Sequence, residues 1–177
     1  IYRGMKLYSF VDNHDVDRIA SKLQDQACLI PVHALLYFLP GIPSVYYGSE
    51  FGISGRKEGG NDAPLRPALS LKELEKEAPH PELAEWIRQM SKIRRKHPAC
   101  TEGRYRELLL TNRQCIFERK TDSERVLVAI NADDQPFMAH FDAGCGTAVD
   151  LITGETHDFG GGSELAPYSA AYWKMER

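Results

Sequence analysis

The chain has 177 residues, 42% of them hydrophobic and 27% charged, which is a globular composition and argues against disorder. A net charge of −3 offers no basic excess for nucleic acid or anionic lipid, and the longest apolar stretch, 28–43, is too interrupted by proline to span a membrane. The four cysteines form no Cys-x-x-Cys pair, so we expect reduced thiols, a cytoplasmic protein, and no metal or other cofactor.

The first half of the chain alternates short apolar runs with helical patterns. An apolar run at 7–11 predicts a strand that ends in a polar cluster, Asp-Asn-His-Asp. A helix is predicted from about 25 to 38, with Pro31 either in its first turn or kinking it, and the Pro-Gly-Ile-Pro sequence that follows ends it. The apolar residues 45–47 predict the next strand, and the glycine-rich, charged segment 49–67 predicts a long loop.

Two further helices are predicted before residue 100. Ser70 and Glu73 have the spacing of a capping box, which predicts a short helix to about residue 78. Pro81 is suited to the first turn of the next helix. That helix carries a single apolar stripe, made of Leu83, Trp86, Ile87, Met90 and Ile93.

Beyond Gly103 the pattern changes to short strands. Six β-type runs separated by turn signals occupy 104–110, 114–120, 125–131, 137–141, 148–153 and 170–175. Tyr172 and Trp173 are adjacent, so they face opposite sides of the last strand, and we expect one of them to be buried. The sequence therefore predicts an α/β domain at 1–102, followed by an all-β domain, an antiparallel β-sandwich, at 103–177.

The first predicted domain requires more strands than it has. Parallel strands lie in sheets that are covered on both faces, so two of them make no stable domain. The chain also opens with Ile1, not Met, and enters a strand within a few residues. We therefore expect a piece of a longer protein, whose unpaired strands would make the isolated chain self-associate.

Four segments, in this order, resemble the α-amylase superfamily, glycoside hydrolase family 13. Residues 10–15 (Phe-Val-Asp-Asn-His-Asp) resemble its strand-seven signature, and 39–50 (Leu-Pro-Gly-Ile-Pro-Ser-Val-Tyr-Tyr-Gly-Ser-Glu) resemble its helix-seven to strand-eight signature. Residues 61–67 are similar to the loop after strand eight, and 93–98 to the last barrel helix. The resemblance implies the last strands and helices of a (β/α)₈ TIM barrel followed by the β-sandwich, with maltogenic amylases, neopullulanases and α-glucosidases as the most similar members.

The resemblance also implies a role for polar residues at the barrel rim, where active sites of this fold form. Asp15 corresponds to a catalytic carboxylate that binds sugar hydroxyls and stabilises the transition state, and His14 to the hydrogen-bonding histidine beside it. Asp62 and Arg66 correspond to a pair that flanks the same subsite, and Tyr47 offers a ring face or a hydroxyl to the sugar. The implied substrate is an α-linked glucan or maltooligosaccharide.

Each of these residues also has a purely structural explanation. Residues 13–15 could form a turn with an Asp that caps the following segment, since short motifs often have no functional meaning. Asp62 and Arg66 could pair with each other without touching substrate, and Tyr47 could fill the barrel. Arg18 could orient a neighbouring Asp by an ion pair or could be a solvated loop charge.

The resemblance assigns the chain only part of a catalytic centre. Retaining glycosidases use a nucleophilic carboxylate and an acid/base carboxyl about 5–5.5 Å apart, and the family carries these on strands four and five, which we do not find here. We expect the chain to contribute Asp15 to a retaining α-glucoside hydrolase and to be inactive alone. Two alternatives remain: a non-catalytic amylase-like binding or scaffold protein, and a free-standing carbohydrate-binding β-domain, against which the lack of a visible aromatic platform counts.

Overall fold

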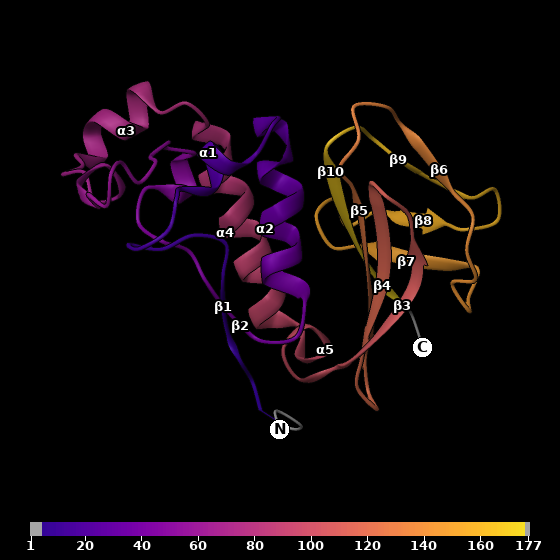
Figure 1. Ribbon diagram of the computed structural model, residues 1–177. Helices are drawn as coiled ribbons and strands as arrows, with labels where there is room; N and C mark the ends of the chain where they lie inside the picture. Colours follow the sequence, from indigo (N-terminus) through magenta and orange to yellow (C-terminus); the bar gives the residue numbers. More distant parts are fainter. Residues whose placement is uncertain (1–4, 176–177) are drawn as a thin grey trace. The chain divides into compact units, whose positions relative to one another are not determined.

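The computed structural model describes residues 5–175 and divides the chain into two compact units (Figure 1). Residues 1–37 and 41–90 form the first unit, and residues 38–40 and 91–177 form the second. The antiparallel strands of the second unit begin at Arg104. The division into domains at 102 and 103 remains a prediction.

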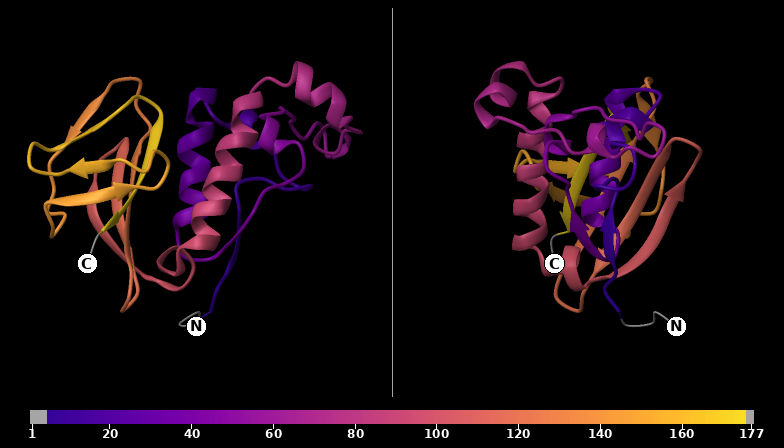
Figure 2. Two further views of the ribbon diagram at one scale, coloured as in Figure 1. Left: turned by 180° about the vertical axis from the view of Figure 1, so that it is seen from behind. Right: turned by 60° about the vertical axis from the view of Figure 1, so that its left-hand side comes forward.

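The first unit contains the two parallel strands, β1 and β2, and most of the helical residues. Its elements are β1 (Tyr8–Phe10), α1 (Ile19–Lys22), η1 (Gln26–Cys28), α2 (Leu29–Phe38), β2 (Ile42–Ser44), η2 (Ser49–Phe51), η3 (Ala63–Leu65), α3 (Leu71–Glu77) and α4 (Pro81–Lys96). The α2 and α4 helices run alongside each other in both views of Figure 2. The last residues of α2 and α4 are assigned to the second unit.

The prediction of a helix ending at 38 is confirmed, because η1 and α2 together cover 26–38. Pro31 is the third residue of α2, in the first turn, where its missing amide proton costs no intrahelical hydrogen bond. The buried His33 bonds within its own helix, where its Nδ1 donates to the Leu29 carbonyl oxygen at 2.7 Å.

The prediction of a strand at 45–47 is wrong, since the strand that follows α2 is β2, at Ile42–Ser44. It pairs in parallel with β1, with Tyr8 opposite Ile42 and Phe10 opposite Ser44, so the ladder stops where β1 stops. Gly41 permits this approach, because its φ is +141° and an added Cβ would lie 2.8 Å from Ser9 Oγ.

The two later helices occur where the sequence predicts them. In α4, Pro81 is the first residue, and the predicted stripe is buried except for Trp86, which is half-buried. The prediction of a capping box at the start of α3 is wrong, because the side-chain hydrogen bond from the N-cap residue is not formed. Ser70 is the N-cap residue, but its side chain makes no capping bond, and its carbonyl oxygen accepts from the Glu73 and Leu74 amides instead.

The second unit contains α5 (Pro98–Glu102) and two antiparallel sheets (Figure 1). The larger has the strand order β3-β4-β5-β10-β7-β8, and the smaller pairs β6 with β9. The bounds are β3 (Arg104–Leu110), β4 (Gln114–Lys120), β5 (Arg125–Asn131), β6 (Phe137–Ala139), β7 (Thr147–Asp150), β8 (Thr156–Asp158), β9 (Ser163–Leu165) and β10 (Ser169–Met175). The first three match the prediction, whereas 151–153 form a turn and β8 and β9 were not predicted.

The expected burial of one of Tyr172 and Trp173 is confirmed, and the other is buried as well, because both faces of the central strands are buried. Trp173 belongs to a cluster that both sheets share, in which Leu127 comes from β5 and Leu165 from β9. Tyr172 lies on the other face, with its ring centroid 4.5 Å from that of Phe38. Burial raises the pKa of the Tyr172 phenol.

No helix within residues 5–175 combines the length and the apolar character that crossing a membrane requires.

Candidate functional site

The segment after β1 is fixed by the buried carboxylate of Asp12. Its Oδ2 accepts a hydrogen bond from the amide of Ile19, the first residue of α1, at 2.8 Å, and one from Ser49 Oγ at 2.8 Å. The next residue, Asn13, closes a turn, because its Oδ1 accepts from the amides of Asp15 and Val16. The turn of the structural explanation is therefore present, and an Asp side chain does accept from the first amide of α1, but it is Asp12 and the N-cap position itself is Arg18.

The Asp15 amide belongs to this turn, but its carboxylate points out of the turn into a charged cluster. Its carboxylate lies 3.2 Å from His14 Nε2 and 3.1 Å from Arg66 Nη2. Arg66 Nη2 also lies 3.1 Å from Asp62 Oδ2, and Arg66 Nε donates to the His14 carbonyl oxygen. The structure thus brings together four of the five predicted site residues, from segments 51 residues apart.

The cluster is open to solvent. More than half of the His14 and Asp15 side chains is exposed, and Arg66 is exposed to 46%. The exposed ion pairs therefore contribute little to folding stability, and their groups are accessible to a ligand. A carboxylate, an imidazole and a guanidinium within hydrogen-bond reach can accept from and donate to neighbouring hydroxyls of a polyol.

Lys57 was missed by the sequence analysis. Its ammonium lies 2.8 Å from Asp62 Oδ1. The hydrogen bond from Lys57 lowers the pKa of Asp62, and the same bond raises the pKa of Lys57. Asp62 is thus held as a carboxylate between two cations, Lys57 and Arg66. The only signal for this contact in the sequence is that Lys57 is a basic residue in the same predicted loop as Asp62. A long loop has no periodic pattern from which the distance between two of its side chains could be predicted.

Tyr47, the fifth predicted residue, is linked to the segment that carries the cluster by a hydrogen bond to its backbone. Its hydroxyl donates to the carbonyl oxygen of Pro67, the residue after Arg66, at 2.9 Å. Its ring packs edge-on against Tyr46, at 4.7 Å between centroids. Tyr47 is 43% exposed, so its ring is available at the surface of this unit.

Arg18 is neither a solvated charge nor the ion-pair partner of a neighbouring Asp. It is fully buried, and it donates to Tyr47 O at 2.6 Å, to Leu65 O at 2.7 Å and to Ser49 Oγ at 3.2 Å. Its guanidinium carbon also lies 4.2 Å from the Tyr46 ring centroid. Arg18 therefore fixes the two tyrosines and the end of the loop that carries Arg66.

Among the described residues, no group of three or more His, Cys, Asp or Glu side chains is placed to hold a metal ion.

The family model that matches the chain is the alpha amylase catalytic domain, over residues 2–123. The chain belongs to this family, the α-amylases of glycoside hydrolase family 13. It is 31% identical over 123 residues to a cyclomaltodextrin glucanotransferase of Bacillus sp. (strain 1011), covering 70% of this chain and 16% of that protein. It is 28% identical over 167 residues to alpha-amylase 2 of Dictyoglomus thermophilum, covering 93% of this chain and 28% of that protein.

Solved structures share the fold of this chain. The α-amylase of Geobacillus thermoleovorans, complexed with acarbose, superposes with a TM-score of 0.80 at 20% identity, over 97% of this chain and 39% of that one. At this identity the likeness shows the fold alone. The chain spans less than a third of the length of the two relatives named above.

Proposed function

We propose that this chain is part of a retaining α-glucoside-acting enzyme and supplies one wall of its sugar site. The observation that supports this most strongly is the cluster of Asp15, His14, Arg66 and Asp62, with Asp15 exposed and held from two sides. In this proposal β1 and β2 are the last two strands of a (β/α)₈ barrel within residues 1–102. Residues 103–177 form the β-sandwich domain that follows it.

The proposed role of Asp15 is electrostatic. As the glucosyl ring gains positive charge, its hydroxyls become more acidic, so a carboxylate that accepts from them binds the transition state more tightly than the ground state. Arg66 and His14 hold the carboxylate in place, and Asp62, fixed by Lys57, holds Arg66. Tyr47 presents a ring to the sugar from the same loop region. The ligand is an α-linked glucan or maltooligosaccharide.

The nucleophile and the acid/base would come from strands outside this chain, so the chain alone would have no turnover. Assays of the purified chain on maltose, maltotriose and p-nitrophenyl α-glucoside test this point. We expect no hydrolysis above the uncatalysed rate, and clear hydrolysis would contradict a divided centre.

The role of Asp15 is tested in the gene product that contains the chain together with its preceding strands. We expect Asp15→Asn to lower kcat about 100-fold or more, because removing one preorganised group that stabilises the transition state costs roughly 10²–10³. The matched control is Glu77→Gln, which removes one exposed carboxylate at the end of α3. Equal activity in the two variants would exclude Asp15 from catalysis.

A further inference from the structure

Three basic residues of the second unit form one rung across three neighbouring strands. Lys120 of β4 lies directly opposite Arg104 of β3 on one side and Arg125 of β5 on the other. Residues directly opposite in antiparallel strands project to the same face, with Cβ atoms about 4.5–5.5 Å apart. Three like charges therefore stand side by side on this face, and we call them the cationic rung.

Neighbouring carboxylates offset the charge of the rung only in part. Glu118, which is buried, accepts from Arg106 Nε at 3.1 Å and from Arg125 Nε, so it serves two cations. Asp122 lies 3.7 Å from Arg104, but both side chains are at least 80% exposed, and such a pair contributes little. The remaining nearby acid, Glu124, bonds to His97 and Ala99 and lies 3.9 Å from Lys174.

Two members of the rung have donors left over. In the part of the chain that the structure describes, Lys120 makes no hydrogen bond or ion pair through its ammonium, and Arg125 uses only Nε, leaving both Nη groups without an acceptor. Like charges directly opposite each other destabilise a sheet. The rung therefore holds unused donors next to like charges that Glu118 and Asp122 offset only in part.

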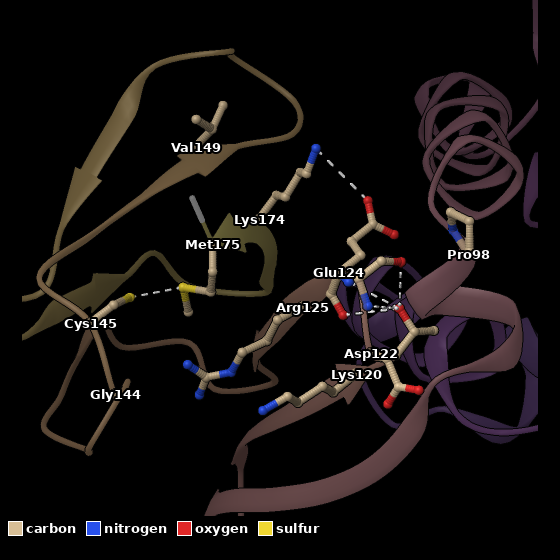
Figure 3. Close-up of a pocket in the computed structure, with 12 residues that line it drawn as sticks. Pro98, Lys120, Asp122, Glu124, Arg125, Gly144, Cys145, Val149, Lys174 and Met175 are labelled. Carbon is tan, nitrogen blue, oxygen red and sulfur yellow. Dashed lines mark hydrogen bonds and ion pairs between the residues drawn. The ribbon is translucent and has the colours of Figure 1, made fainter. Parts of the chain in front are cut away.

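The same two residues line a groove of about 850 Å³ within the second unit. Figure 3 shows Lys120 and Arg125 extending to the same side, with the Arg125 guanidinium towards Gly144. Gly144 has a φ of +68°, and an added Cβ would stand 3.2 Å from Arg125 Nη1, so the backbone here comes close to the guanidinium. Cys145 and Met175 contribute further wall, and the groove thus has room beside the free donors.

We propose that the cationic rung and this groove bind a phosphate group. Guanidinium and ammonium groups donate charge-assisted hydrogen bonds to phosphate oxygens, and the two free Nη groups of Arg125 match two of them. The phosphate could be inorganic or an ester carried by a glucan. The site itself is independent of the proposed function, and only the glucan source rests on it.

The test is a titration of the full chain with inorganic phosphate at constant ionic strength, followed by NMR. We expect chemical-shift changes at Lys120, Arg125 and Gly144, and a Kd that Lys120→Gln weakens about ten-fold, the equivalent of one charge-assisted bond. Lys120 is exposed, so the variant should fold, and in phosphate-free, low-salt buffer it should melt no lower than the parent. The control is Arg113→Gln, which removes an exposed cation in the turn at the other end of the β3–β4 hairpin.

The outcomes distinguish a phosphate site from a general response to salt. No response beyond that to sodium chloride, or equal weakening by Arg113→Gln, would overturn the proposal. A phosphorylated maltodextrin that binds at least ten-fold more tightly than inorganic phosphate, with unmodified maltodextrin inert at the rung, would support a glucan ester. Equal affinity for both phosphates would support free phosphate as ligand. Asp15→Asn should leave each of these responses unchanged, so failure here is distinct from failure of the proposed sugar site.

Discussion

The parallel pair β1–β2 and the six-stranded antiparallel sheet are built from similar apolar residues but bury them very differently. Tyr8 of β1 is 66% exposed and Ile42 of β2 is 50% exposed, whereas Leu127 of β5 is fully buried. Parallel sheets are normally covered on both faces, while antiparallel sheets close a core with local hairpins. Among residues 5–175, β1 and β2 find only each other, and their apolar faces remain open.

The two units also differ in where their polar side chains are placed. In the first unit, the ion pairs of the candidate site are exposed, and the buried polar groups, Asp12 and Arg18, hold the loops beneath it. In the second unit, the pair His97–Glu124 is largely buried, with side chains 6% and 12% exposed, and ties the start of α5 to the β4–β5 turn. The ion pairs of the candidate site in the first unit are therefore accessible to solvent, whereas the His97–Glu124 pair connects two segments inside the second unit.

The largest expected effect comes from truncating one apolar residue in each sheet. Leu127→Ala should lower the free energy of unfolding by about 2–5 kcal/mol, because it leaves a cavity in a closed core. Ile42→Ala should lower it by less than about 1 kcal/mol, since half of the side chain is already exposed. Urea unfolding followed by circular dichroism measures both. Similar losses of stability in the two variants would contradict this difference in burial, and would mean that the Ile42 side chain is buried in solution.

A smaller effect is expected from the buried pair of the second unit. Burial alone would raise the pKa of Glu124, but hydrogen bonds from His97 and the Ala99 amide, with the charges of His97 and Lys174, outweigh it and lower the pKa. We expect Glu124→Gln to cost about 1–3 kcal/mol at neutral pH, the range for a buried charged hydrogen bond that is lost. Arg66→Gln, in the exposed cluster, should cost less than about 1 kcal/mol.

The stabilisation by Glu124 should depend on pH in one direction. The pKa of Glu124 is lower in the folded than in the unfolded chain, so its stabilisation is complete above the unfolded value of about 4.3 and is lost as the pH falls through the folded value. The difference between the parent and Glu124→Gln should therefore shrink below about pH 4.3. A difference that stays constant down to acid unfolding would show that Glu124 acts only by its shape.

The sequence predicts regular elements well where a local pattern dominates. The strands β3, β4 and β5 are β-type runs separated by turn signals, and their bounds were predicted. The helix α4 has an apolar stripe and begins at Pro81, and this first residue was predicted. The strand after α2 was misplaced, because a three-residue parallel strand is defined by its partner and not by its own pattern. The strands β8 and β9 are antiparallel, but they too have only three residues, too few to show an alternating pattern of their own.

For the candidate site, the resemblance supplied what periodicity could not. His14, Asp15, Asp62 and Arg66 were named from motif positions, and the structure brings them together. Arg18 was misjudged, since nothing in a sequence distinguishes a buried arginine that binds backbone carbonyls from a solvated one. Such burial depends on the tertiary contacts with Tyr47 and Leu65, which lie 29 and 47 residues away.

The smallest expected effect distinguishes two helix starts within the first unit. The Asp25 side chain accepts from the Ala27 amide at 2.8 Å at the start of η1, whereas Ser70 makes no such bond at α3. A capping residue that uses its side chain contributes about 0.5–2 kcal/mol. Asp25→Ala should therefore lower the free energy of unfolding by about 1 kcal/mol, and Ser70→Ala by less than about 0.5 kcal/mol. If chemical unfolding shows the larger loss for Ser70→Ala, its hydroxyl caps α3 in solution, and the loop before α3 is held by local side-chain bonds in the same way as the segment before η1.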